Sequence, residues 1–122
     1  MTETFFFDTY ALIELVKGNP DYVKFKNSGK MTSMMNLLEL YYSFLLDFDE
    51  KTAEFYFNIF LNFLVPYNEN TIKNAAKFRF RNRKSGLSYV DCLGYIIAFE
   101  NSVKFLTGDK GFKDLENVEF VR

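Results

Sequence analysis

Leu87–Phe112, LSYVDCLGYIIAFENSVKFLTGDKGF, is the stretch that decides the fold. Ser88 is placed to cap a helix, because its hydroxyl can accept the free backbone N–H of Asp91. The run VDCLGYIIAF is apolar apart from Asp91, which is typical of a helix covered on every side. Val103–Thr107 then predicts a buried strand, and Gly108-Asp109 turns the chain at the carboxyl end of that strand. A helix followed by a strand in this way favours a parallel α/β sheet, in which ligands bind beyond the carboxyl ends of the strands.

Length and composition limit the class of protein. The chain has 122 residues, which suits a single domain spanning 1–122, and 48% hydrophobic with 25% charged residues is typical of a globular protein. The one cysteine, Cys92, excludes an intramolecular disulfide and favours a reducing, cytoplasmic location. No apolar stretch reaches the ~20 residues of a membrane span, so we expect no membrane contact. Histidine is absent, which excludes Ser–His and Cys–His nucleophile pairs, so carboxylates must carry any catalysis.

The first part of the chain predicts strands and helices in alternation. Thr4–Phe7 is a short apolar run typical of a buried strand, and Asp8 follows it at the start of a helical pattern that ends at Val16. Lys30–Thr32 predicts a brief strand, and a long helix follows from Ser33 to about Leu46. Asp8 therefore marks the junction between the first strand and the first helix.

The remaining segments continue this order. We expect a short helix over 21–27, a helix over 49–64 and at most an edge strand at 65–67. A helix capped by Asn70 is predicted to run to about Lys84, and a final strand is predicted over 118–121. This order predicts a single layered α/β sandwich.

Each acidic candidate for a functional role also has a purely structural interpretation. Asp8 or Thr9 can cap the first helix, Asp91 can be the acidic member of a Ser-x-x-Asp capping box, and Asp109 can be an ordinary turn residue. Glu39 belongs to a polar stripe on the long helix that can simply face water. The case for chemistry therefore depends on whether these acids meet.

A parallel sheet would bring Asp8, Asp91 and Asp109 to one edge, with Glu39 as a fourth candidate. A cluster of carboxylates without interleaved Lys or Arg repels itself at pH 7, and a divalent cation relieves the repulsion. Oxygen ligands suit Mg²⁺ or Mn²⁺, whereas the lack of histidine and of cysteine pairs argues against zinc. A cation held in this way supports hydrolysis of phosphate esters.

The chain contains one charge cluster, although its net charge is only −1. No acid occurs between Asn70 and Val90, and two phenylalanines, Phe78 and Phe80, interleave with the cations Lys73, Lys77, Arg79, Arg81, Arg83 and Lys84. A charge run of this kind is either a solvated helix face or a patch that follows nucleic-acid phosphates, with aromatic rings available to stack on single-stranded bases.

Three segments together resemble a known family. FFFDTYALIEL (5–15), TSMMNLLELYY (32–42) and the Leu87–Phe112 stretch are similar to successive motifs of the PIN-domain ribonucleases, most closely the small VapC-like toxins of type II toxin–antitoxin systems. The resemblance covers essentially the whole chain. Its most specific part is the S-x-x-D helix start followed by LTGDKxF. It implies a PIN-like three-layer sandwich, in which helices flank a parallel sheet of four to five strands.

The resemblance also implies a site and an activity. In that family four acids coordinate Mg²⁺ or Mn²⁺ and carry catalysis, and by motif they match Asp8, Glu39, Asp91 and Asp109. Thr107 matches a supporting hydroxyl residue, and Thr9 and Ser33 are further hydroxyl candidates. The implied activity is metal-dependent endoribonuclease cleavage of RNA phosphodiester bonds. The implied partners are the RNA substrate, a cognate antitoxin that binds a hydrophobic groove near the site, and a second copy of the chain in a homodimer.

The contacts with RNA phosphates would come from the basic residues Lys73, Lys77, Arg79, Arg81 and Arg83. Other functions remain as alternatives to a toxin: a PIN nuclease of RNA processing, or a non-catalytic PIN-like interaction module. A phosphohydrolase with Asp8 as nucleophile ranks below these, because that chemistry often uses Asp-x-Asp and position 10 is Tyr10.

Overall fold

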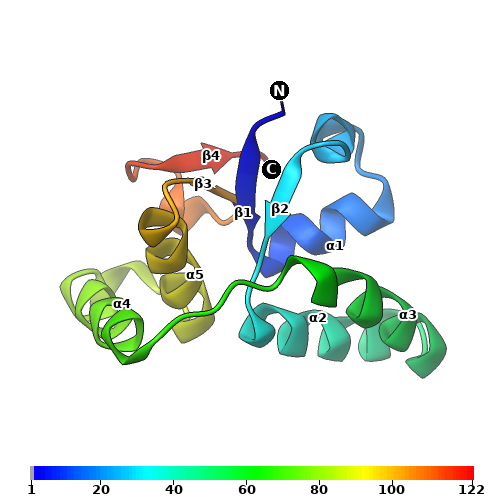
Figure 1. Cartoon of the computed structure of the whole chain (residues 1–122), viewed down its shortest axis with the longest axis horizontal. Coiled ribbons are helices and arrows are strands. Elements are labelled where there is room, and N and C mark those ends of the chain that lie inside the picture. Colours follow the sequence, from blue (N-terminus) through cyan, green and yellow to red (C-terminus); the bar gives the residue numbers. More distant parts are fainter. Residues whose placement is uncertain (1) are drawn as a thin grey trace.

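A parallel β-sheet forms the centre of the computed structural model, which describes residues 2–122 (Figure 1). Within this range the sheet has four strands: β1 (Thr4–Phe7), β2 (Gly29–Met31), β3 (Lys104–Thr107) and β4 (Val118–Phe120). Their order across the sheet is β2-β1-β3-β4, and each neighbouring pair is parallel. Phe7 pairs with Leu106, so the two central strands end side by side. The expected fold class, a PIN-like α/β sandwich on a parallel sheet, is confirmed.

Helices make up the outer layers and the connections. The described residues form five α-helices: α1 (Thr9–Lys17), α2 (Met34–Asp47), α3 (Glu50–Phe60), α4 (Glu69–Arg81) and α5 (Tyr89–Glu100). Short 3₁₀ helices join or extend these elements: η1 (Pro20–Phe25), η2 (Leu61–Phe63), η3 (Arg83–Ser85) and η4 (Lys110–Phe112). None of the described helices is both long enough and apolar enough to cross a membrane.

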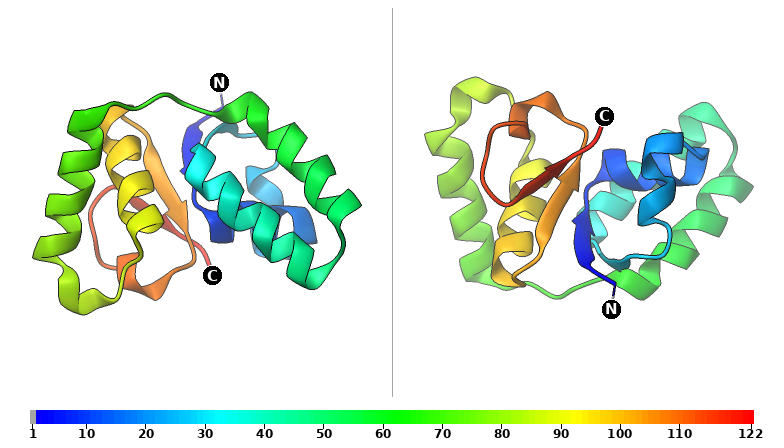
Figure 2. Two further views of the ribbon diagram at one scale, coloured as in Figure 1. Left: turned by 90° about the horizontal axis from the view of Figure 1, so that it is seen from below. Right: turned by 90° about the horizontal axis from the view of Figure 1, so that it is seen from above.

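The two faces of the sheet bury different cores because the side chains of a strand alternate between faces. Phe5 and Phe7 of β1 pack into a core shared with α1, η1, α2 and α3. Phe6 of β1 and Phe105 of β3 pack into the other core, against α4 and α5. Figures 1 and 2 show the same arrangement, with α1, α2 and α3 on one side of the sheet and α4 and α5 on the other.

The start of α4 differs from the prediction. Asn68 caps this helix, not Asn70: its side-chain oxygen accepts the N–H of Thr71 at 3.2 Å. The Thr71 hydroxyl accepts the N–H of Asn68 in return at 3.3 Å, which completes a capping box. Both asparagines are good caps, but only Asn68 has a hydroxyl three residues later to form the reciprocal bond.

Two further segments are shorter or less regular than a standard element. The short helix expected over 21–27 is the 3₁₀ helix η1, which begins at Pro20 and ends at Phe25. Within the described chain, residues 65–67 form no strand, and a single isolated bridge joins Thr32 to Leu64 just before Pro66. Proline lacks the N–H that a longer ladder would need there.

Gly94 allows α5 to approach the sheet closely. A Cβ atom built at this buried position would lie 2.7 Å from the Phe6 ring and 3.0 Å from the Phe105 ring. Both rings are completely buried and stacked with centroids 5.8 Å apart, so neither has room to move away. The glycine therefore fixes how close the first residues of α5 come to the carboxyl ends of β1 and β3.

We predict that Gly94→Ala lowers the free energy of unfolding by about 1–3 kcal/mol, because overpacking forces these rings from their positions. Urea denaturation followed by circular dichroism measures the effect. Asn74→Ala on the exposed face of α4 is the matched control and should change stability by less than about 0.5 kcal/mol. At an uncrowded helix position Gly→Ala stabilises by up to about 1 kcal/mol, so a gain in stability would contradict the close approach.

Candidate active site

Asp8 lies at the carboxyl end of β1 and is 1% exposed. As the N-cap of α1, its Oδ1 accepts the N–H of Ala11 at 2.7 Å. Its Oδ2 accepts a 2.5 Å hydrogen bond from the hydroxyl of Thr107, the last residue of β3. One donor comes from the helix and the other from the neighbouring strand, so together they hold the carboxylate in one orientation at the edge of the sheet.

Burial raises the pKa of Asp8 from its ordinary 3.8 to about 7. The hydrogen bonds from Thr107 and Ala11 lower the pKa, but they do not offset the loss of hydration. The negative charges of Asp91 and Asp109 raise it further. Near neutral pH, an added positive charge at this point would therefore favour the ionised form of Asp8.

Asp91 and Asp109 each form the local contact that their structural interpretation predicts. Asp91 closes a capping box at the start of α5: Ser88 N donates to its Oδ2 at 3.2 Å, and Asp91 N donates to Ser88 Oγ at 3.0 Å. Asp109 caps η4, with Oδ1 accepting the N–H of Gly111 at 2.8 Å. The Asp109 N–H donates in turn to Thr107 Oγ1 at 3.0 Å, so Thr107 contacts both Asp8 and Asp109.

Glu39 projects from α2 and is held by a hydroxyl of α1. Its Oε1 accepts a 2.6 Å hydrogen bond from Thr9 Oγ1. Asn36 Nδ2 donates to the same Thr9 oxygen at 3.1 Å, and Ser33 Oγ donates to Asn36 Oδ1 at 2.6 Å. This chain of hydrogen bonds fixes the position of the Glu39 side chain relative to the end of β1.

Sequence reasoning missed the role of Asn36, which belongs to the same polar stripe of the long helix as Glu39. The residue is fully buried and links Ser33 to Thr9. The available signal was its spacing, because Asn36 lies one helical turn before Glu39 on the same face. A buried amide among Met and Leu neighbours requires hydrogen-bond partners, and here it finds them beside the acid.

The four acids affect one another electrostatically, and we call them the acidic cluster: Asp8, Glu39, Asp91 and Asp109. Burial raises the pKa of Asp91, and the charges of Asp109 and Glu39 raise it further. Among residues 2–122 the one salt bridge joins Lys17 and Asp47 at 3.7 Å, and neither residue belongs to the cluster. The structure thus brings together acids from four elements without a pairing lysine or arginine in the part of the chain it describes.

The spacing of the cluster is not that of a closed coordination shell. Within the described residues no group of three or more Asp, Glu, Cys or His side chains is positioned to hold a metal ion. The donor set nevertheless fits a hard divalent cation by its chemistry, because it consists of carboxylate oxygens. The raised pKa values of Asp8 and Asp91 show that positive charge would stabilise their ionised forms.

The basic residues of the sequence divide into two groups. Lys73, Lys77 and Arg81 are exposed on α4. Arg79 is partly buried: its Nε donates to the carbonyl of Leu87 at 3.1 Å. Arg83 donates to the carbonyl of Phe80 at 2.8 Å, with its guanidinium carbon 4.6 Å from the centre of that ring.

The two phenylalanines of this segment have different environments. Phe80 is 64% exposed, as a stacking surface requires. Phe78 is partly buried and packs against Tyr95, Phe112 and the rest of the core under α4 and α5. Of the two rings, Phe80 is therefore the more accessible to a stacked base.

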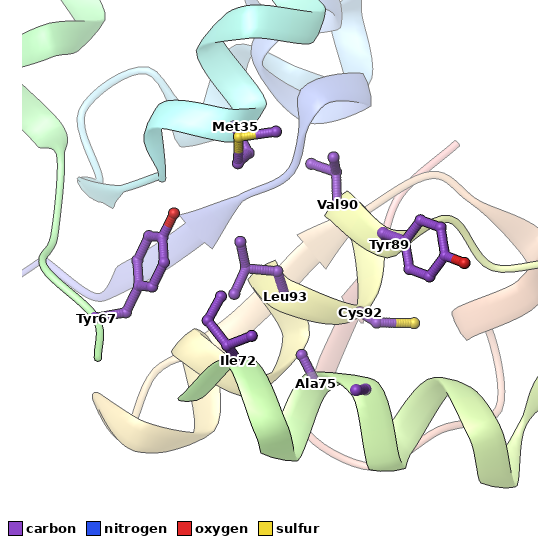
Figure 3. A pocket seen from close by; sticks show the side chains of 9 residues that line it. Met35, Tyr67, Ile72, Ala75, Tyr89, Val90, Cys92 and Leu93 are labelled. Atoms are coloured by element: carbon purple, nitrogen blue, oxygen red, sulfur yellow. The ribbon is translucent and has the colours of Figure 1, made fainter. Parts of the chain in front are cut away.

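An apolar cavity of about 330 Å³ lies next to the acidic cluster, between α2, α4 and α5 (Figure 3). Met35 of α2 is one helical turn before Glu39, and Val90 of α5 precedes Asp91 directly. Figure 3 shows both side chains facing the cavity, which is otherwise lined by Tyr67, Ile72, Ala75, Ala76, Tyr89, Cys92 and Leu93.

Comparison with known proteins agrees with this architecture. The chain is similar in structure to a chain of a toxin–antitoxin complex from Klebsiella pneumoniae, with a TM-score of 0.73 and 16% sequence identity. The similarity covers 94% of this chain and 95% of that one. It is also similar to a chain of VapBC2 from Rickettsia felis bound to a fragment of promoter DNA, with a TM-score of 0.71 and 19% sequence identity. That similarity covers 97% of each chain.

A third solved structure, PAE2754 from Pyrobaculum aerophilum, gives a TM-score of 0.71 at 13% identity, over 99% of this chain and 92% of that one. No curated protein sequence matches significantly. The model of the PIN domain family matches residues 5–118, which contain the whole acidic cluster. This chain belongs to the PIN domain family.

Proposed function

We propose that this protein is an Mg²⁺- or Mn²⁺-dependent endoribonuclease that hydrolyses RNA phosphodiester bonds. The observation that carries the proposal is the acidic cluster, because the burial of Asp8 and the repulsion between Asp8, Asp91 and Asp109 have a cost unless a cation is bound. Membership of the PIN domain family supports the same activity. A divalent cation supplies positive charge at a phosphate and lowers the pKa of bound water.

The residues of the site have separate tasks in this proposal. Asp8, held by Ala11 and Thr107, is a fixed metal ligand, and Asp91 and Asp109 are ligands that their caps already orient. Glu39, held by Thr9, is a ligand or the general base toward the attacking water. The exposed cations of α4 contact the RNA phosphates.

We further propose that the protein is the toxin of a toxin–antitoxin pair. Two of the similar structures come from such complexes, and the apolar cavity beside Glu39 and Asp91 offers a surface that an antitoxin would cover. The apolar side chains of Leu38, Tyr42 and Leu46, each more than half exposed on α2, support a homodimer. A PIN nuclease of RNA processing is the alternative, and a small antitoxin gene next to this one would favour the toxin.

We predict that Asp8→Asn and Asp91→Asn each reduce RNA cleavage by at least about a hundredfold while the fold persists, because the amide lacks the charge that the cation requires. The measurement is cleavage of an end-labelled RNA oligonucleotide with Mg²⁺ or Mn²⁺, and EDTA should abolish it. Asp47→Asn, which removes the surface ion pair with Lys17, is the control and should cleave like the parent. Unchanged cleavage in both site variants would refute the catalytic assignment.

A second prediction concerns stability without metal. The folded-state pKa of Asp8, about 7, is above its ordinary 3.8, so folding favours the protonated form and this stabilisation is lost as pH rises through 7. In EDTA, the free energy of unfolding of Asp8→Asn should therefore be higher than that of the parent by about 1–4 kcal/mol near pH 8. The difference should be much smaller near pH 5. Thermal melts at the two pH values measure the difference.

Added Mn²⁺ should raise the melting temperature of the parent near pH 8 and raise that of Asp8→Asn much less. The reason is that only the parent has an Asp8 carboxylate whose negative charge the cation can neutralise. A variant that is less stable than the parent at both pH values would contradict the prediction. It would mean that the carboxylate acts chiefly as the cap of α1.

A non-catalytic interaction module on the same scaffold remains the alternative to a nuclease. Calorimetric titration of the parent with Mn²⁺ separates the two functions: binding that Asp91→Asn weakens supports the nuclease, and absence of binding supports the module.

A further inference from the structure

Tyr89 is an aromatic side chain that the fold does not use for its core. It is the first residue of α5 and is 73% exposed. The guanidinium carbon of Arg79 lies 4.2 Å from the centre of its ring, and the Arg79 Nε is fixed by its hydrogen bond to the carbonyl of Leu87. The ring is therefore held against a cation on one side and open to solvent on the rest of its surface.

The cation in contact with this ring, Arg79, belongs to a basic segment of the chain. Tyr89 and Arg79 both lie in the acid-free segment between Asn70 and Val90, and no salt bridge recorded in residues 2–122 involves this segment. At the end of α4 a polar hollow of about 300 Å³ is lined by Arg81, Asn82, Arg83, Lys84 and Ser85. Cations beside an exposed aromatic ring are the combination that binds single-stranded nucleic acid, through phosphates and base stacking together.

Tyr89 is also close to the acidic cluster in the chain. Asp91 follows two residues later in the same first turn of α5, at the edge of the sheet where Asp8 and Asp109 lie. Figure 3 shows the Tyr89 ring at one end of the apolar cavity and directed away from Val90. Tyr89 and Asp91 thus share the first turn of α5, so one RNA strand can extend from the acidic cluster toward this ring.

We propose that the Arg79–Tyr89 pair is a stacking platform for one base of a single-stranded RNA next to the phosphate that is cleaved. The inference rests on the proposed nuclease function and narrows its substrate class, because a base paired within a duplex cannot lie flat on the ring. The positive charge around Tyr89 favours a nucleic acid over a protein segment, although the ring also borders the apolar cavity.

Binding measurements on the full chain test the platform separately from catalysis. The protein carries Asp8→Asn and is kept in metal-free buffer, and the probe is a fluorescent single-stranded RNA of mixed sequence followed by anisotropy. Tyr89→Leu should weaken binding about fivefold to a hundredfold, which corresponds to one lost base–aromatic stack. Tyr89→Phe, which keeps the ring, should bind within about twofold of the parent. Phe55→Leu on α3 removes a ring that is 58% exposed outside the basic segment, and should have no effect.

A series of RNAs with a single abasic position locates the stacked base. At one position the missing base should weaken binding to the protein with Tyr89 but not to the Tyr89→Leu variant, since the same contact cannot be lost twice. An abasic profile that is identical in the two proteins overturns the proposal. That result would leave Tyr89 as a wall of the apolar cavity and available to a protein partner.

The lack of tryptophan in the chain provides an independent optical test. Tyr89→Trp introduces a single indole at the platform, and its fluorescence should be quenched by the single-stranded RNA and not by the same sequence in a duplex. Phe55→Trp on α3 is the control, and its fluorescence should respond to neither form of RNA. Equal quenching by the two forms of RNA overturns the single-stranded assignment.

The cleavage assay keeps this inference distinct from the proposed function. If Asp8→Asn abolishes cleavage and Tyr89→Leu leaves both cleavage and RNA affinity unchanged, the result supports the nuclease and overturns the platform. Loss of RNA affinity in Tyr89→Leu, in a protein whose parent does not cleave, supports the platform and overturns the nuclease.

Discussion

The parallel pairing of β1 with β3 is the constraint on which the rest of this structure depends. It joins residues about a hundred positions apart, and the hydrogen bond from Thr107 to Asp8 lies directly beyond the paired residues Phe7 and Leu106. Because parallel strands end at the same edge, the turn at Asp109 and the start of α5 at Asp91 come to the same place. Gly94 then lets α5 approach Phe6 and Phe105 closely enough to deliver Asp91 there.

The structural and functional interpretations of the acids are compatible. Asp8, Asp91 and Asp109 each cap a helix, and the cap at Asp91 or Asp109 uses one oxygen of the carboxylate. A cap fixes the orientation of the side chain, which is what a metal ligand needs. The same placement leaves Asp8 buried and Asp91 and Asp109 partly buried, and burial raises the pKa values of Asp8 and Asp91. The fold therefore holds these acids in an arrangement that is unfavourable without a cation.

The elements of the fold could be predicted where a local pattern determines them. Thr4–Phe7 and Val118–Phe120 form strands because short apolar runs have nowhere else to be buried, and Ser88 caps α5 because its hydroxyl and the Asp91 carboxylate are three residues apart. Long-range contacts could not be predicted in this way. The burial of Asn36, for example, depends on Thr9 of another helix. The start of α4 is a different case, because the Asn68–Thr71 capping box is local and its three-residue spacing is visible in the sequence. The pairing of Arg79 with Tyr89 joins two helices whose relative position only the fold defines.

In the proposed function, the charge distribution would let a chain with a net charge of −1 bind a polyanion. The acids of the cluster are buried or partly buried at the sheet edge, where they repel a phosphate unless a cation intervenes. The basic residues are on the neighbouring helix, and the first turn of α5 separates the two sets, with Asp91 in the cluster and Tyr89 against Arg79. An RNA strand would therefore be attracted at α4 and would reach the acids only with a divalent ion in place. The proposed function thus places attraction and cleavage on different surfaces, so that RNA binding without metal would be separable from the reaction.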